Sequence, residues 1–294
     1  MNLIVKLLMR IRGSLNRPGE YNIVKKLEVC AKIPKIIHQI YHSKILPVEL
    51  ENNIRNIKAK NPDWEMRLYD FEEIDNYLQN NFPSLLRFYK KINPNYLAAR
   101  ADFFRYVVIY KEGGVYLDIK SATDSPLNSI IGINDKYILS QWPRSYSNWG
   151  QHIDITNPGG EFQQWHIISV AGHPFLKAVI DNVCNNIVRY NPFVHGTGAF
   201  GVINLTGPIA YTKTILRLLE NSPHRLEKDH LALGLIYCAT DNESGISGHR
   251  QIFDKKHYSK LDEPVIIQSK IISFLFAKSK PFINVIISKI KSTL

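Results

Sequence analysis

The sequence predicts an α/β fold for this chain, and three observations lead to that prediction. Strand-like and helix-like segments alternate between residues 33 and 80, which is the pattern of a sheet covered by helices. A long helix pattern then runs into Gly113-Gly114, and a further strand pattern follows. The chain has 294 residues, 45% of them hydrophobic, which is enough to build a core without disulfides or a structural metal.

The first two elements follow a basic leader. The short apolar run IPKIIHQIY at 33–41 predicts the first core strand. A helix is predicted over 49–60. It stops before Asn61-Pro62, because a residue that precedes proline disfavours the helical region.

The next two elements are predicted by alternation and by a capping pattern. Residues 64–69 (WEMRLY) alternate as a strand does. Asp70 lies three residues before Glu73, which is the spacing of a capping box and predicts a helix over 71–80.

The helix pattern that follows carries a charged pair. Asn95 is expected to cap a helix over 96–112, which Gly113-Gly114 ends. Two neighbouring stripes run along this helix, one formed by Leu97, Ala101, Phe104 and Val108, the other by Ala98, Asp102, Arg105 and Ile109. Asp102 and Arg105 therefore share a face. Because that face lies beside the apolar stripe, their replacement is expected to change stability little.

A strand is predicted over 115–120, and its period of two separates two faces. Val115, Leu117 and Ile119 face the core, and the opposite face carries Tyr116, Asp118 and Lys120. A polar trio at the end of a strand, directly after a helix with an Asp/Arg pair, indicates a functional site. A solvated sheet edge with a salt bridge is the alternative.

Positive charge is concentrated at the two ends of the chain. Residues 1–32 carry seven basic and two acidic residues, and residues 266–294 carry five lysines and no acid, so each end contributes +5 to the net charge of +11. The residues between them carry 25 basic and 24 acidic side chains. A nucleic-acid-binding protein concentrates its charge on the folded body, so this distribution argues against a nucleic-acid partner.

Both ends also repeat apolar residues at helical spacing. Neither end has about 18 uninterrupted apolar residues, so neither is predicted to span a bilayer. Basic amphipathic ends suit an anionic membrane surface, whereas packing on the domain or in an oligomer is the alternative. We therefore expect a leader (1–31), one domain (32–265) and amphipathic C-terminal helices (266–294). The three cysteines, Cys30, Cys184 and Cys238, fit buried thiols of a reducing compartment, so a cytoplasmic protein peripheral to the membrane is expected.

Several pieces of the chain match a known pattern in order and spacing. They are IPKIIHQIY (33–41), NPDWEMRLYD (61–70), ARADFFRYVVIYKEGGVYLDIK (99–120), Pro126-Leu127 and TGP (206–208). Together they resemble glycosyltransferase family 32, the DXD-containing sugar-transferase group, over residues 32–215. They are more distantly similar to the glucosylating domain of the large clostridial toxins. The resemblance implies a GT-A type domain, with a central mixed sheet flanked by helices, that transfers a sugar from a nucleotide-sugar with retention of configuration.

The resemblance also implies catalytic and donor-binding roles. Asp118 matches the first Asp of the DXD motif, which holds the donor ribose and the metal ion bound to the diphosphate. Tyr116 resembles the tyrosine that lines the nucleotide pocket. Asp102 and Arg105 resemble the D-x-x-R helix motif, which contacts the donor sugar and its phosphate side. No protein base is nominated, because retaining enzymes of this kind generally show no obvious nucleophile.

The nucleotide and the acceptor are implied less directly. His38 and Gln39 resemble the end of the first strand, where the base and ribose rest. A UDP-sugar is the expected donor, with GDP-mannose next. The basic amphipathic ends add the expectation of a membrane-associated glycan or glycolipid acceptor in surface polysaccharide synthesis.

The chain departs from the family at position 120, where Lys120 replaces the second Asp of DXD. Paired carboxylates would hold Mn²⁺ or Mg²⁺, whereas a lysine cannot ligate the ion but can contact the diphosphate as a point charge. Three interpretations stay open. The metal is held by Asp118 with Asp124 or His257, Lys120 partly replaces the metal, or the site is inactive. In the last case the chain is a non-catalytic protein that binds a nucleotide-sugar or a glycan.

Two further motifs leave alternatives open. Residues 195–201 (HGTGAFG) contain G-x-G-x-x-G, but no β-branched strand precedes it, so dinucleotide binding is not expected. A loop that shapes the acceptor or phosphate side, or a plain turn, remains. Trp142, Trp149 and Trp165 cluster in sequence with Tyr146, which predicts either core packing or stacking on an acceptor sugar.

Overall fold

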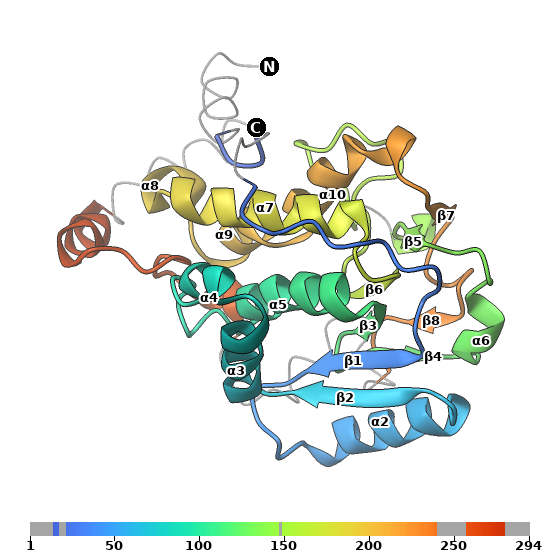
Figure 1. Cartoon of the computed structure of the whole chain (residues 1–294). Helices are drawn as coiled ribbons and strands as arrows, with labels where there is room; N and C mark the ends of the chain where they lie inside the picture. Colours follow the sequence, from blue (N-terminus) through green and yellow to red (C-terminus); the bar gives the residue numbers. More distant parts are fainter. Residues whose placement is uncertain (1–13, 18–21, 147–148, 240–256, 280–294) are drawn as a thin grey trace.

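A computed structural model describes residues 14–17, 22–146, 149–239 and 257–279, and its centre is a six-stranded mixed sheet (Figure 1). The strands are β1 (Ile36–Ile40), β2 (Glu65–Tyr69), β3 (Gly114–Leu117), β5 (Tyr137–Ser140), β6 (His166–Ser169) and β7 (Arg225–Glu227). Their order is β2-β1-β3-β6-β5-β7. β1 is parallel to β2 and β3, β6 is antiparallel to β3 and β5, and β7 is parallel to β5. The short strands β4 (Ala122–Thr123) and β8 (Leu235–Ile236) form a separate antiparallel pair.

Helices cover both faces of the sheet. They are α2 (Val48–Lys60), α3 (Phe71–Asn81), α4 (Pro83–Tyr89), α5 (Leu97–Glu112), α6 (Leu127–Ile130), α7 (Pro174–Arg189), α8 (Pro192–His195), α9 (Gly198–Leu205) and α10 (Pro208–Leu216). Residues 270–279 are also helical. The α/β fold with a mixed, helix-flanked sheet is thus confirmed, and it is the architecture expected of a GT-A type domain.

Two hydrophobic clusters occupy the two faces of the sheet. Tyr116 and Ile167 enter the larger cluster with residues of α3, α4, α5, α7, α9 and α10. Val115 and Ile168, which alternate with them along β3 and β6, enter the smaller cluster with residues of α2 and α6. The period of two predicted for the strand is therefore confirmed as far as β3 extends.

Most of the predicted element bounds hold, and two do not. The capping box at Asp70 and Glu73 is present and opens α3. Asn95 does not cap α5, because its amide donates to Glu263 Oε1 instead (2.7 Å), and Tyr96 occupies the cap position. The strand predicted to reach residue 120 ends at Leu117, since the chain turns there and Ser121 N donates to the carbonyl oxygen of Asp118 (2.8 Å).

The helix α5 lies at the centre of the molecule (Figure 1), against β3 and β6 on one side and α7 on the other. It is buried around most of its circumference, so the expectation that Asp102 and Arg105 lie away from the core is wrong. Gly113 and Gly114 join it to β3 with positive φ values of 70° and 96°. A Cβ at Gly114 would lie 2.5 Å from the carbonyl oxygen of Ile36, so only glycine allows this close approach.

The two ends of the chain differ in the parts that the structure describes. Leu15 and Val24, from the expected leader, are buried in the larger core cluster. In the tail, Ile271 is 73% and Phe274 61% exposed on the helical residues 270–279, which extend away from the body (Figure 1). The remaining predictions for amphipathic ends fall on residues 1–13 and 280–294, outside the described residues. Among the helices that are described, none combines the length and hydropathy needed to cross a bilayer.

The cysteines match their prediction only in part. Cys184 is buried, but Cys30 is exposed.

Candidate functional site

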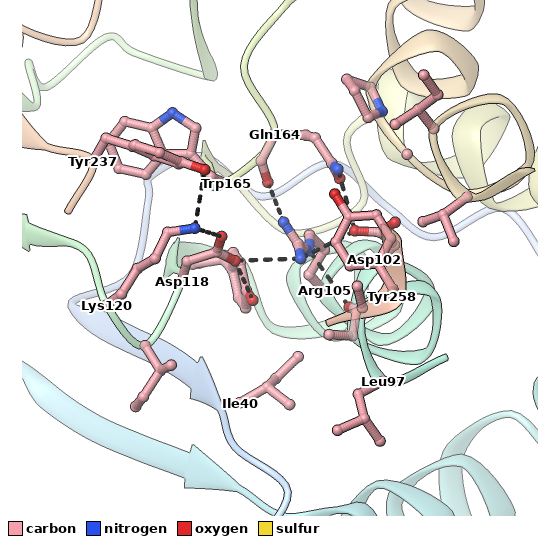
Figure 2. Close-up of a pocket in the computed structure, with 18 of the residues that line it drawn as sticks. Ile40, Leu97, Asp102, Arg105, Asp118, Lys120, Gln164, Trp165, Tyr237 and Tyr258 are labelled. Atoms are coloured by element: carbon pink, nitrogen blue, oxygen red, sulfur yellow. Dashed lines mark hydrogen bonds and ion pairs between the residues drawn. The ribbon is translucent and has the colours of Figure 1, made fainter. Parts of the chain in front are cut away.

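A pocket of about 590 Å³ opens beyond the ends of β1 and β3. It is lined on one side by Ile40 and Leu97, and on the other by Trp165 and Tyr237 (Figure 2). Between these sides lies a row of four charged residues, which we call the charged row. Its members are Asp102, Arg105, Asp118 and Lys120. The structure therefore brings together the four residues that the sequence nominated for catalysis.

Arg105 joins the two acids of the charged row. Its Nη2 atom lies 3.0 Å from Asp102 Oδ1 and 3.3 Å from Asp118 Oδ1. The guanidinium also stands over the ring of Tyr116, 4.6 Å from its centroid. Burial lowers the pKa of Arg105, but Tyr116, Asp118 and Asp102 outweigh burial, so the net shift is upward. The guanidinium is a permanent cation in the pocket wall.

Asp102 is held by donors from two other parts of the chain. Thr206 Oγ1 donates to Asp102 Oδ2 (2.8 Å), and Gln164 Nε2 donates to Asp102 Oδ1 (3.1 Å). The carbonyl oxygen of Gln164 also accepts from Arg105 Nη1 (2.8 Å). Burial raises the pKa of Asp102, although Arg105 and the two donors act in the opposite direction. Thr206 belongs to the TGP piece, one of the pieces that carry the family resemblance, whereas no sequence motif indicated a role for Gln164.

The buried state of this pair corrects one expectation. Asp102 is 3% and Arg105 5% exposed, so they are part of the packed interior. Removing one partner would leave a buried charge without its counterion, which costs several kcal/mol (roughly 3–5). Their replacement is therefore expected to change stability as well as chemistry.

Lys120 points into the pocket at the end of the charged row (Figure 2). Its Nζ atom lies 3.7 Å from Asp118 Oδ2 and donates to the hydroxyl of Tyr237 (3.0 Å). It also lies 4.2 Å from the centroid of the Tyr237 ring. Burial lowers the pKa of Lys120, but Tyr237 and Asp118 outweigh it and the net shift is upward. Lys120 is thus a cation at neutral pH.

Hydrogen bonds from the segment after β8 hold the backbone around Lys120. Ala239 N donates to the carbonyl oxygen of Lys120 (2.8 Å), and Ser121 Oγ donates to the carbonyl oxygen of Tyr237 (2.7 Å). Tyr237 was not singled out from the sequence, because more than a hundred residues separate it from the motif that it completes.

His38 and Gln39 do not reach the pocket, although both were expected near the nucleotide. His38 is fully buried, and its ring nitrogens face the Tyr69 hydroxyl and the Gly113 carbonyl oxygen, each at 3.1 Å. Burial and nearby Arg67 lower the pKa of His38 to about 3, so it is neutral. Gln39 borders a separate small hollow. The pocket is lined instead by the next residues, Ile40, Tyr41 and His42, because the sheet ends there. Tyr116, which was also expected at the nucleotide, does line it.

Of the three residues expected to ligate a metal, Asp118 and His257 line the pocket and Asp124 does not. Asp118 already faces two cations, Arg105 and Lys120. The Asp124 side chain is 77% exposed, lies 3.8 Å from Lys60 Nζ, and does not line the pocket. His257 lines the pocket, but it also contacts Ser259 Oγ at 2.7 Å. In the part of the chain that the structure describes, no three acidic, histidine or cysteine side chains gather as a metal site requires. These residues therefore do not fit the paired-carboxylate site of the family.

Aromatic residues form the end of the pocket beyond Lys120. Trp142, Trp149 and Trp165 all line it together with Tyr237. Trp165 is 4% exposed and packs in the smaller core cluster, whereas Trp149 is 39% exposed. Of the two alternatives left open by the sequence, core packing therefore holds for Trp165. The glycine-rich segment ends in α9, from which Val202 and Ile203 reach the pocket wall.

The fold and the charged row agree with the resemblance to the DXD-containing sugar-transferase group that the sequence shows. Residues 47–137 match the family described as "Glycosyltransferase sugar-binding region containing DXD motif". This range contains all four residues of the charged row, on α5 and in the turn after β3. The resemblance drawn from the sequence is confirmed by this match.

Proteins similar to this chain include two mannosyltransferases. The chain is 29% identical over 55% of its length to an initiation-specific alpha-1,6-mannosyltransferase of Candida albicans, and covers 46% of that protein. It is 28% identical over 61% of its length to inositol phosphoceramide mannosyltransferase 3 of Schizosaccharomyces pombe, and covers 44% of it. It thus spans less than half the length of these two relatives. Among solved structures, PaToxG glycosyltransferase superposes with a TM-score of 0.47 at 19% identity, covering 73% of this chain and 78% of that one.

Proposed function

We propose that this protein is a retaining glycosyltransferase that moves a sugar from a nucleotide-sugar to a membrane-associated glycan acceptor. The observation that carries the proposal is the charged row, which sets two fixed cations, Arg105 and Lys120, on either side of Asp118 in one pocket. A UDP-sugar is the proposed donor. GDP-mannose is the alternative, and the printed names of the two fungal mannosyltransferases support it.

The chemistry requires cations at this place. When the bond between the anomeric carbon and the diphosphate oxygen breaks, negative charge grows on the leaving diphosphate. Arg105 and Lys120 stabilise that charge more than they stabilise the bound donor, which lowers the barrier. The acceptor hydroxyl then bonds to the anomeric carbon on the same face, and its proton passes to the leaving phosphate oxygen.

The charge of Lys120 changes how strongly the reaction depends on Mn²⁺ or Mg²⁺, the ions that the resembled family uses at this motif. Two unit charges about 4 Å apart interact by roughly 4 kcal/mol at an effective dielectric of about 20, which is large enough to matter for a leaving group. We therefore propose that Lys120 supplies part of the neutralisation and that a divalent ion is bound weakly or is partly dispensable. Asp118 positions the donor and keeps both cations in the pocket.

The membrane part of the proposal is supported by the tail. Ile267, Ile271 and Phe274 are all more than half exposed near Lys270 and Lys278. Such an apolar and basic surface binds anionic lipid through burial and charge together. The names of relatives that act on inositol phosphoceramide, a lipid, also support a membrane-bound acceptor. A cytoplasmic location at the membrane face and a role in surface polysaccharide synthesis remain part of the proposal.

A donor panel tests the proposed function. UDP- and GDP-sugars would be added singly, with and without Mn²⁺, and the melting temperature and donor hydrolysis would be measured. One donor should raise the melting temperature by mass action and should be hydrolysed. Binding of a donor without hydrolysis or transfer would favour the non-catalytic alternative. Failure of every nucleotide-sugar to bind would contradict the proposal.

Vesicles test the membrane part separately. The intact chain should sediment with vesicles of phosphatidylserine and phosphatidylcholine, and added salt should release it. Ile271→Glu with Phe274→Glu should weaken this binding while donor hydrolysis is retained, because both residues lie outside the pocket. Unchanged sedimentation of the double variant and of a chain that lacks both ends would contradict a membrane role.

A further inference from the structure

The aromatic end of the pocket continues outward from Lys120 as a connected wall. The ring centroid of Trp142 lies 5.0 Å from that of Tyr237, and the centroid of Trp149 lies 5.2 Å from that of Trp142. Both pairs meet edge to face. Trp149 keeps 39% of its surface exposed at the pocket, so one large aromatic side chain is left uncovered where a ligand can reach it.

An acid and a histidine lie beside this wall. Glu161 Oε1 accepts a hydrogen bond from Trp142 Nε1 (2.7 Å), and Glu161 Oε2 lies 2.6 Å from His152 Nε2. The Glu161 side chain is only 9% exposed, whereas His152 is 24% exposed. Both line the pocket. A hydrogen-bonded carboxylate is therefore held in a largely buried position beside Trp142, which in turn packs against the exposed Trp149.

Gly150 fixes the conformation of the loop that carries Trp149 and His152. Gly150 has a φ of +73°, and Glu161 N donates to its carbonyl oxygen (2.8 Å). A Cβ at Gly150 would lie 2.3 Å from Trp142 Cδ1 and 3.0 Å from Glu161 Cγ. The backbone therefore presses directly against both side chains, which sets the wall and the acid in a fixed relation.

Resting on the proposed function, we propose that Trp142, Trp149, His152 and Glu161 form the acceptor subsite, and that this subsite takes a six-membered polyhydroxylated ring. Such a ring has an apolar C–H face, which packs on an aromatic side chain, and hydroxyls, which donate to a carboxylate. An anionic ring would be repelled by the Glu161 carboxylate.

The position of the subsite suits transfer. Tyr237 touches both Lys120 and the aromatic wall, so a ring held on the wall lies beside the part of the pocket that receives the donor diphosphate. A hydroxyl of the acceptor ring can then approach the anomeric carbon of the donor from the side of the leaving group. A pyranose or a cyclitol such as inositol offers the same chemistry, and the experiment separates them.

The test uses the full chain and small soluble rings. Binding of methyl α-D-mannopyranoside, methyl α-D-glucopyranoside and myo-inositol would be measured by saturation-transfer NMR with UDP or GDP present. The variants are Trp149→Ala and Glu161→Gln, and the matched control is Phe193→Ala, an exposed aromatic (42%) outside the pocket. The melting-temperature shift caused by the nucleotide alone reports the donor side for each protein.

The wild type and Phe193→Ala should bind at least one of the three rings. Trp149→Ala should lose about tenfold in affinity for it, because the aromatic face is removed, and Glu161→Gln should lose a similar amount. The nucleotide shift should persist in both variants. Which ring binds tells a pyranose acceptor from a cyclitol acceptor.

Three results would overturn the subsite. They are the absence of ring binding by a wild type that binds nucleotide, equal ring binding by all variants, and loss of the nucleotide shift together with ring binding. The last would assign the aromatic end to the donor. Ring binding without any nucleotide shift would support the subsite and contradict the proposed donor, so the two failures are distinguishable.

Discussion

The two ends of the pocket are built from different kinds of structure. The charged row comes from α5 and the end of β3, at the centre of the sheet, and its side chains hold one another through short contacts. The tryptophans of the aromatic end come from the segment between β5 and β6, which has a short 3-10 turn at Arg144–Tyr146 and leaves Trp149 exposed. Groups that stabilise charge need a rigid setting, whereas groups that choose a ligand can sit on a loop carried by that setting.

The largest expected effect concerns the charged row. Arg105→Ala should lower donor turnover by about 10²- to 10³-fold, because a preorganised cation is removed from the leaving group. It should also lower the free energy of unfolding by roughly 3–5 kcal/mol, because Asp102 and Asp118 lose their counterion. Donor hydrolysis and urea unfolding measure the two effects. Arg105→Lys, which keeps a charge, should lose less stability. If Arg105→Ala were as active and as stable as the wild type, the charged row would not be the rigid catalytic end.

The next effect concerns Lys120. Lys120→Ala should lower turnover by about tenfold or more and should make the remaining activity more dependent on added Mn²⁺. Lys120→Asp should strengthen the response to Mn²⁺, since it restores the paired carboxylates. Lys35→Ala, which removes an exposed lysine outside the pocket, is the control and should behave as the wild type. Unchanged turnover and unchanged metal response in Lys120→Ala would return the site to ordinary metal dependence.

A smaller effect depends on pH and on two buried histidines. His38 lies in β1, and His166 lies in β6 against Trp165 of the aromatic end. Burial lowers the pKa of each to about 3. Below pH 6.5 the unfolded chain binds protons that the folded chain does not, so stability falls as pH falls from 6.5 towards 3. Each histidine should cost about 1.5 kcal/mol between pH 6.5 and pH 5.

Urea unfolding at pH 7, 6 and 5 measures this dependence. Glutamine cannot take up the proton, so His166→Gln should reduce the loss of unfolding free energy between pH 6.5 and pH 5 by about 1.5 kcal/mol, the contribution of one histidine. A free energy of unfolding that does not change between pH 7 and pH 5 would show that the histidines are not buried as described.

The smallest effect sharpens the comparison within the loop. Gly150→Ala should cost about 1–2 kcal/mol of stability, because φ is positive there and the new Cβ would meet Trp142. Binding of the acceptor ring should weaken severalfold while the nucleotide shift is retained. Gly132→Ala is the matched control, since its Cβ would meet only Asp135 at 3.4 Å. Equal loss of nucleotide and ring binding in Gly150→Ala would mean that the two ends are not independent.

The sequence by itself determined the local elements and the charged row. A capping box, a proline stop and a period of two are local rules, so α2, α3 and β2 appear close to where they were predicted. Asp102 and Arg105 are three residues apart on one helix, and Asp118 and Lys120 follow within one connection. The contacts among these four residues therefore depend on short-range geometry, which can be predicted from the sequence.

Only the tertiary structure decided what completes the site. Gln164, Thr206 and Tyr237 reach the charged row across 60 residues or more, and such partners leave no periodic pattern in the chain. The burial of α5 on nearly all sides was likewise decided by the packing of α7 and the sheet around it. His38 and Asp124 show the converse, since both are residue types suited to a site but neither lines the pocket. His38 lies within β1 and contacts Tyr69 and Gly113, and Asp124 is exposed near Lys60. Long-range packing chooses which of the suitable side chains face the same cavity.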